Sequence, residues 1–276
     1  MSRSYFVKVP ICIIGQSLAQ YNYPVLCYQS DDVGFSLTLE PGSGGLEVKW
    51  LSPIAAYIKR KLSILLPRLE ALKVDVKMEF SRTLPLIDSI IVALRTIYGE
   101  VGLKEVSLYS LSKRLAVPKW RMRITLEAMR GEGLMAYREG EGLMELQDRF
   151  PWAIGLCIKI PSRFKFSKAN GFEDSLEAAI HSLGRLIISV ARSILNSDFK
   201  LFRNALQRYT KLSIALSNLP LTTLKAYEVL SRDGEVACKV DEDFKGFMLF
   251  SENEEAMMKC MERARKMGFQ ALALRG

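Results

Sequence analysis

Hydrophobic and polar residues follow two periods along this chain, and the period changes from segment to segment. Alternating and short apolar runs predict strands at residues 5–14, 33–39, 46–51, 74–80, 134–137, 143–146, 152–160, 236–240, 246–250 and 270–274. Helical spacing predicts helices at residues 55–72, 85–98, 107–115, 119–130, 173–195, 199–217, 221–233 and 254–268. A glycine-rich turn joins the strands at 33–39 and 46–51, so these two are expected to form a hairpin. Helices on one side of antiparallel strands predict an α+β fold in two halves, residues 1–150 and 151–276.

Composition narrows the classes of partner. The chain has 276 residues, 49% hydrophobic and 25% charged, the balance of an ordinary globular protein. Its net charge of +9 favours an anionic partner, either a nucleic acid or a phosphorylated or carboxylated small molecule. No apolar run reaches the ~20 residues of a membrane helix, and the first residues lack the apolar core of a secretory signal. We therefore expect a cytoplasmic protein without a membrane partner.

Cysteine and histidine usage excludes several kinds of site. The five cysteines are widely spaced, with no CxxC pair, so zinc and redox motifs are not indicated and no metal site is predicted. They are Cys12, Cys27, Cys157, Cys238 and Cys260. The single histidine, His181, lies in an apolar helical stretch. A mechanism that needs a His-based dyad or a His-ligated metal has almost no material in this chain.

The C-terminal part resembles the end of the GHMP kinase superfamily. Cys238-Lys239-Val240 and residues 246–250 (GFMLF) match a strand ending in "AK(V/L)" and the strand after a glycine-rich loop. Residues 34–41 and 131–140 are similar to stretches of the archaeal β-ribofuranosylaminobenzene 5′-phosphate synthases, one branch of that superfamily. The resemblance implies a GHMP-kinase-like fold. Its first half would be ribosomal-protein-S5-domain-2-like and its second half ferredoxin-like.

The chain departs from that superfamily at the phosphate-binding loops. The glycine-rich "GLGSS" loop allows backbone N–H groups to approach an anion at a helix N-terminus. The matching stretch here, residues 81–89, has no glycine, and Asp88 is expected to add a negative charge close to the anion. Asp241, Glu242 and Asp243 replace small residues in the C-terminal loop. Each carboxylate near a phosphate costs on the order of 1–4 kcal/mol, which argues against ATP-dependent phosphoryl transfer.

The resemblance also implies which residues would form a site if activity survives. Arg82, Ser89, Lys245 and Gly246 are the positions that would face the anion. Glu132 would lie near the acceptor and is the one catalytic candidate, and no general base is identified. No cofactor is assigned, except Mg²⁺ together with a phosphorylated substrate. The ligand expected on this reading is an anionic small molecule.

Residues 85–147 also fit a winged helix-turn-helix. Lys119, Arg121 and Arg123 would lie on its recognition helix and contact DNA, with residues 134–146 as the wing. A third reading is a non-catalytic relative that binds a protein partner or forms a homodimer. The sequence leaves these readings open, because a fold by itself does not specify a function.

Overall fold

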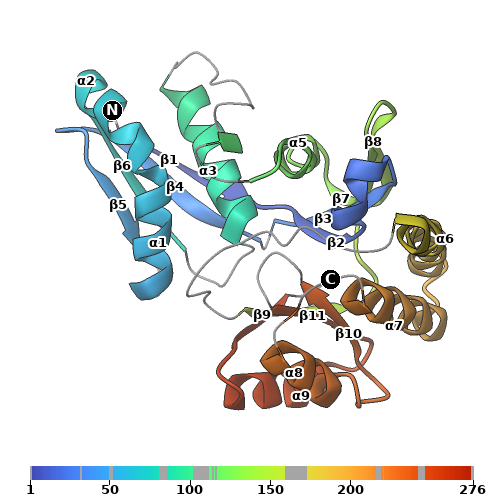
Figure 1. Ribbon diagram of the computed structural model, residues 1–276. Helices are drawn as coiled ribbons and strands as arrows, with labels where there is room; N and C mark the ends of the chain where they lie inside the picture. The colour runs from blue at the N-terminus through green and yellow to red at the C-terminus, as the bar shows by residue number, and fades with distance from the viewer. Residues whose placement is uncertain are drawn as a thin grey trace. The chain divides into compact units, whose positions relative to one another are not determined.

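The computed structural model describes most of the chain (Figure 1). The residues it describes are 2–31, 33–49, 52–80, 86–101, 112–113, 115, 117–158, 173–215, 219, 221–241 and 246–274. They form two compact units, one made of Met1–Ile11 and Gln29–Arg130, the other of Cys12–Tyr28 and Gly131–Gly276. The predicted division near residue 150 falls inside the second unit. No helix among the described residues has the length and apolarity of a membrane span.

The first unit contains a four-stranded sheet in the order β1-β4-β6-β5. Its strands are β1 Arg3–Lys8, β4 Gly34–Pro41, β5 Leu46–Lys49 and β6 Val74–Glu79. Strand β4 pairs antiparallel with β1 and β6, whereas β5 pairs parallel with β6. The predicted hairpin of residues 33–39 and 46–51 is therefore wrong, because β6 lies between the two strands.

The loop between β4 and β5 explains this arrangement. The carboxylate of Asp75, in β6, accepts hydrogen bonds from the backbone N–H groups of Gly44 (2.8 Å) and Gly45 (2.6 Å). Gly44 has φ +96°, a left-handed conformation that favours glycine. These hydrogen bonds lower the pKa of Asp75. The loop is thus fixed at the start of β6 and leads into β5 on the far side of that strand.

The helices of the first unit follow the predicted spacing with one interruption. Those within the described residues include α1 Ser52–Leu62, α2 Leu66–Leu72, α3 Leu86–Glu100 and α5 Lys119–Ala128. Most of the helix predicted at residues 107–115 lies outside the described residues. The helix predicted at residues 55–72 is divided into α1 and α2 by the 3₁₀ turn η2, Ser63–Leu65. Pro67, in the first turn of α2, has no N–H to donate to the preceding turn, which accounts for the break. Leu65 and Leu69 are fully buried.

A second four-stranded sheet, in the order β2-β3-β7-β8, belongs mainly to the second unit. Its strands are β2 Ile11–Ile14, β3 Val25–Gln29, β7 Gly133–Arg138 and β8 Gly142–Gln147. The 3₁₀ helix η1, Gln16–Tyr21, connects β2 to β3. The single strand predicted at residues 5–14 is two strands in two different sheets, separated at Pro10, which lacks an N–H for a sheet ladder.

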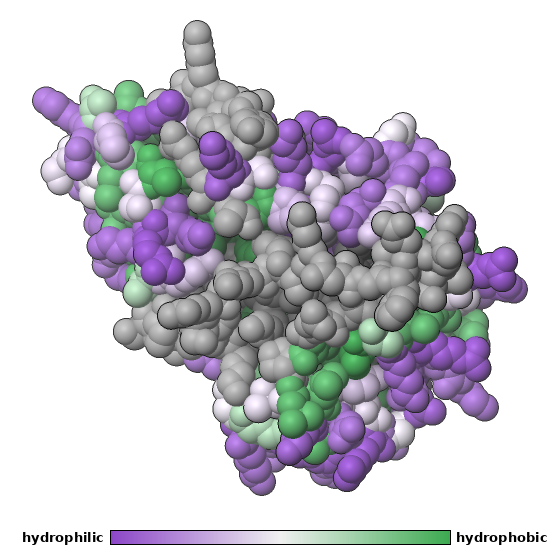
Figure 2. All heavy atoms as spheres, viewed as in Figure 1, coloured by the Kyte–Doolittle hydropathy of each residue, from purple (hydrophilic) through white to green (hydrophobic). Residues whose placement is uncertain are grey.

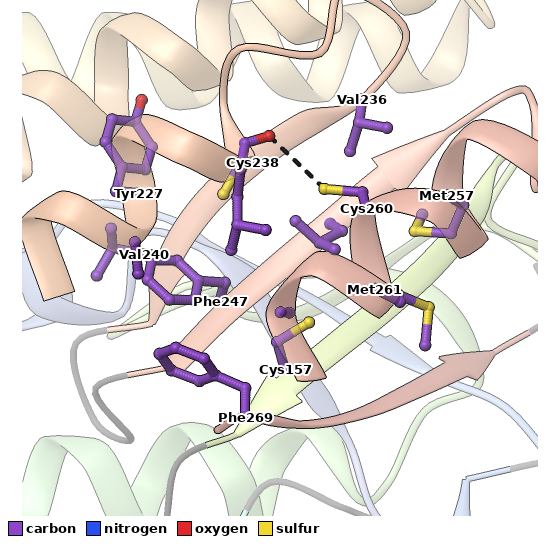
Figure 3. Packing of buried hydrophobic residues seen from close by; sticks show 14 of the residues in the cluster. Cys157, Tyr227, Val236, Cys238, Val240, Phe247, Met257, Cys260, Met261 and Phe269 are labelled. Atoms are coloured by element: carbon purple, nitrogen blue, oxygen red, sulfur yellow. Dashed lines mark hydrogen bonds between the residues drawn. The ribbon is translucent and has the colours of Figure 1, made fainter. Parts of the chain in front are cut away.

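The rest of the second unit has the ferredoxin-like arrangement implied by the resemblance. The elements in chain order are β9 Ala153–Ile158, α6 Glu173–Leu195, α7 Phe199–Ala215, α8 Leu221–Leu230, β10 Ala237–Asp241, β11 Gly246–Ser251, α9 Glu254–Lys266 and β12 Gln270–Leu274. The sheet order β10-β11-β9-β12 is that of a βαββαβ unit, and all its pairs are antiparallel. Each predicted element of this region is present. Side chains of α8, α9 and the sheet form one core (Figure 3).

Aromatic residues fill the other side of this sheet. Phe202, on α7, lies 4.5 Å from Trp152 and 5.2 Å from Phe250 between ring centroids. Phe150 lies 5.6 Å from the ring of Phe250. Such pairs add stabilisation beyond the area they bury. The aromatic cluster therefore fixes α7 on the sheet and leaves the opposite side of that helix to solvent.

Candidate functional site at the start of helix α3

The first turn of α3 is the place where the resemblance puts a phosphate-binding loop. Residues 81–85, and with them Arg82, lie outside the described residues. From Ile87 onward the helix is buried, and both Asp88 (1% exposed) and Ser89 (0%) are shielded from solvent. The structure thus places the predicted Ser89 inside the protein, in the same turn as a buried carboxylate.

Asp88 is part of a closed hydrogen-bonded network between α3 and α5. The guanidinium of Arg121 donates to Asp88 Oδ2 over 2.6 Å through Nη2, and to Thr125 Oγ1 over 2.9 Å through Nη1. The hydroxyl of Thr125 donates to Asp88 Oδ1 over 2.6 Å. Both oxygens of the carboxylate are thereby occupied. A charged pair that has lost its water needs such complete hydrogen bonding to be tolerated.

This network corrects the expected role of Asp88. The carboxylate was expected to stand close to a bound anion, but it is buried and paired with a cation of its own chain. A helix N-terminus carries a partial positive charge, which favours a nearby anion. Asp88 supplies that anion from within the first turn of α3. The polar groups at this end of the helix therefore already have an intramolecular counter-charge.

The same contacts correct one of the three DNA-contact predictions. Arg121 is fully buried and bound to Asp88, so its predicted contact with DNA is wrong. Lys119 and Arg123 are exposed on α5, and their predicted role stays a prediction. The two strands predicted for the wing form the antiparallel pair β7–β8, which belongs to a four-stranded sheet assigned mainly to the other unit.

The remaining predicted site residues are not brought together within the described part of the chain. Glu132 is exposed, and its backbone N–H lies 3.4 Å from a carboxylate oxygen of Glu145. Gly246 begins β11, where a Cβ atom would lie only 2.3 Å from the carbonyl oxygen of Cys157. Glycine is thus needed at 246 for strand packing, whatever its role toward an anion. Lys245, Glu242 and Asp243 lie outside the described residues.

Three of the cysteines lie as thiols in one apolar core. Cys157, Cys238 and Cys260 lie in the core shown in Figure 3, where Cys260 donates to the carbonyl of Leu230. Burial raises the pKa of Cys157 to about 12 and that of Cys260 to about 11. Burial also raises the pKa of Cys238. These thiols are poor nucleophiles, since the thiolate is the reactive form.

His181 forms a structural contact with Tyr23. Its Nδ1 lies 2.7 Å from the hydroxyl of Tyr23, and the two rings meet edge to face. Gly184, one turn further along α6, leaves room for the tyrosine ring, because a Cβ there would lie 2.1 Å from a ring carbon. The pair holds the segment before β3 on helix α6. Among the described residues, no group of three His, Cys, Asp or Glu side chains could hold a metal ion.

Sequence reasoning missed the partner of Asp88. A signal for it was present, because Arg121 and Thr125 are four residues apart and therefore share one face of α5. Met122 and Ile124 beside them are fully buried. A cation among buried positions of one helix and a carboxylate among apolar positions of another predict a buried ion pair.

Comparison with known proteins finds solved structures of similar fold. No protein-family model and no curated protein matches the sequence. Among solved structures, mevalonate kinase from methicillin-resistant Staphylococcus aureus is similar over 99% of this chain and 98% of its own, with 12% identity and a TM-score of 0.63. Mevalonate pyrophosphate decarboxylase from Streptococcus pyogenes is similar over 99% of this chain and 96% of its own, with 9% identity and a TM-score of 0.58. Homoserine kinase from Cytophaga hutchinsonii is similar over 99% of this chain and 93% of its own, with 10% identity and a TM-score of 0.53. The chain therefore has a GHMP-kinase-like α+β fold.

Proposed function

We propose that this chain is a divergent GHMP-superfamily protein, nearest the β-ribofuranosylaminobenzene 5′-phosphate synthases, that does not transfer phosphate from ATP. The observation that carries the proposal is the buried network of Asp88, Arg121 and Thr125 in the first turn of α3. The fold is shared with the mevalonate and homoserine kinases described above. On this proposal the Asp88 carboxylate has replaced the phosphate at the start of α3.

A bound phosphate and the Asp88 carboxylate would compete for the same positive charge at the start of α3. A phosphate at the start of α3 would need the helix N–H groups and a nearby cation. Arg121 is a cation next to this turn, and it is bound to Asp88 with no exposure to solvent. If Arg121 turned to a ligand, the Asp88 carboxylate would stay buried without its charge partner. Breaking such a pair costs about 3–5 kcal/mol, which exceeds the gain from one new charge-assisted hydrogen bond.

Heat denaturation of the purified protein tests the proposal. A kinase site filled to a hundred times its Kd would stabilise the folded state by about 2.7 kcal/mol, a shift of several degrees for a chain of this size. We expect no such shift with MgATP, measured against Mg²⁺ alone. A shift of several degrees that requires Mg²⁺ would contradict the proposal. A shift with Mg²⁺ and phosphoribosyl pyrophosphate, but not with MgATP, would support surviving synthase-like binding of an anionic substrate.

A second candidate function is DNA binding through α5. Lys119 and Arg123 are exposed on this helix and could contact phosphates without disturbing the Asp88–Arg121 pair. The test is a titration with duplex DNA at several salt concentrations, using the native chain and a Lys119→Ala/Arg123→Ala variant. Salt-dependent binding that the variant loses supports this candidate. Equal binding by both proteins excludes it.

A further inference from the structure

Helix α7 and the part of α6 that follows its acidic residues Glu173, Asp174 and Glu177 carry a concentration of positive charge that neither the fold nor the proposed function uses. Residues 180–215 contain six Lys and Arg residues and a single acidic residue, Asp198. The carboxylate of Asp198 accepts the backbone N–H of Leu201 at the start of α7. The acid of this stretch thus caps a helix, and it forms no ion pair with a cation among the described residues.

The cations lie on the solvent sides of the two helices. Arg185 and Arg192 are exposed on α6, and Lys200, Arg208 and Lys211 are exposed on α7. Their spacings of seven, eight and three residues keep those on each helix on one face. The opposite faces are occupied by core residues such as Ile187 and Phe202. We call these five side chains the basic surface.

The basic surface is electrostatically uncompensated. None of its five side chains has an ion pair with any residue that the structure describes. Helix α9, in the same unit, differs: Lys259 is paired with Glu255 at 2.6 Å, and Arg263 with Asp233 at 3.4 Å. Uncompensated like charges on adjacent helices raise the local potential and attract an anionic partner. The positive charge is therefore a property of this surface and not of helices in this unit generally.

The pattern of apolar residues favours a polyanionic strand over a membrane. On the face of α6 that carries the arginines, Ile188 (64% exposed) lies between the two, and Leu195 (48% exposed) lies beyond the second. A helix that inserts into a membrane separates its apolar and basic residues onto two faces, whereas here they alternate. Figure 2 shows hydrophilic atoms next to a band of hydrophobic ones where Figure 1 places α7.

We propose that the basic surface of α6 and α7 binds the phosphate backbone of a nucleic acid without reading its sequence. From Lys200 to Lys211 the cations extend about 16 Å along α7, at 1.5 Å per residue. A strand with a regularly repeated charge can contact several of them together, which a single small anion cannot do. Arginine and lysine contacts to phosphates position a nucleic acid and carry no base specificity. This inference does not rest on the proposed function, since it concerns a different surface.

Fluorescence anisotropy with labelled single-stranded RNA and with duplex DNA tests the inference on the full chain. Binding should weaken with salt, with a slope of log K against log[salt] of about −0.7 to −0.9 for each phosphate contacted. An Arg192→Ala/Arg208→Ala variant should lose two such contacts, which reduces the slope by roughly 1.5. It should also weaken binding by roughly fivefold to eightfold per contact at 0.1 M salt. The two labelled probes show which nucleic acid is preferred.

Two matched variants make the result specific. Lys259→Ala removes a cation that is already paired on α9 and should leave binding unchanged. Arg263→Ala removes a second paired cation of α9 and should also leave it unchanged. All these side chains are exposed, so equal melting temperatures show that the variants fold. The inference is overturned by an absence of salt-dependent binding, by loss of binding in either control, or by tighter binding to phosphatidylserine vesicles or polyglutamate.

Discussion

Replacing Arg121 with alanine is the most direct way to measure the network at the start of α3. The substitution removes the donor that lies 2.6 Å from Asp88 Oδ2 and leaves a carboxylate that is 1% exposed with one partner, the hydroxyl of Thr125. Breaking a buried ion pair by removing one member costs about 3–5 kcal/mol, because the remaining charge stays desolvated. We therefore expect the Arg121→Ala variant to lose about 3–5 kcal/mol of unfolding free energy, a large fraction of the total for a typical protein.

Urea denaturation followed by circular dichroism gives the comparison, with a matched control near the end of the same helix. Arg130 is 2.8 Å from Glu127, but its side chain is 71% exposed. An exposed pair contributes about 0–1 kcal/mol, so Arg130→Ala should cost no more than that. The contrast between Arg121→Ala and Arg130→Ala isolates the effect of burial from that of removing an arginine.

A double variant separates charge burial from loss of packing. Asp88→Leu/Arg121→Met removes both charges and puts apolar side chains in their place. The hydroxyl of Thr125 can still donate to the backbone carbonyl of residue 121, which lies 3.3 Å away in the native chain. Apolar replacement of a whole buried pair is often neutral or stabilising. The double variant should accordingly be more stable than Arg121→Ala. The reasoning is refuted if Arg121→Ala loses less than about 1 kcal/mol, or if the double variant is no more stable than it.

Three further predictions follow from other contacts. Since burial raises the pKa of Cys157 to about 12 and of Cys260 to about 11, fewer than about one in a hundred of these thiols ionises at pH 8. Iodoacetamide should label them only after unfolding, and mass spectrometry that finds them labelled in the folded protein would contradict this. Backbone N–H groups lower the pKa of Asp75 below the ordinary value of an aspartate, so its stabilising contribution is present above that ordinary pKa and is lost as the pH falls through the lower folded-state pKa. Asp75→Asn should therefore flatten the acid side of the curve of stability against pH, and an unchanged curve would count against the loop contact. Gly184→Ala should destabilise the protein by about 1–3 kcal/mol through a clash with a tyrosine ring, whereas Gly99→Ala, with open space around it, should be neutral or stabilising by up to about 1 kcal/mol. Equal thermal stability of the two variants would refute the clash.

The ferredoxin-like part of the fold was predictable because its signals are local. The helix Glu254–Lys266 begins at Asn253, whose side chain accepts the N–H groups of Glu255 and Ala256, as expected of a helix cap. Helical spacing and apolar strand runs indicated every other element of that region as well. Where the period of the pattern decides the structure, the sequence is sufficient.

Strand partners in the first unit were less predictable. The glycine-rich turn after β4 is typical of a hairpin. Its backbone N–H groups, however, donate to Asp75, which lies in a strand about thirty residues further along the chain. In the sheet of the second unit, the strand β3, Val25–Gln29, was missed because all five residues are buried, so that no alternation marks it.

The candidate site was also only partly predictable. Asp88 was noticed as a charge, but its partner Arg121 lies on another helix and was assigned to the surface.

The discontinuous second unit has a consequence for how the protein is made. Residues 12–28 leave the ribosome before residues 131–276, yet they belong to a compact unit that only the later residues complete. At 5–20 residues per second, the intervening segment takes about 5–20 s to synthesise. During that time β3 has no β7 to pair with, so the edge of a mainly apolar strand stays open on the nascent chain. A chaperone that shields extended apolar segments would act on this protein in that interval.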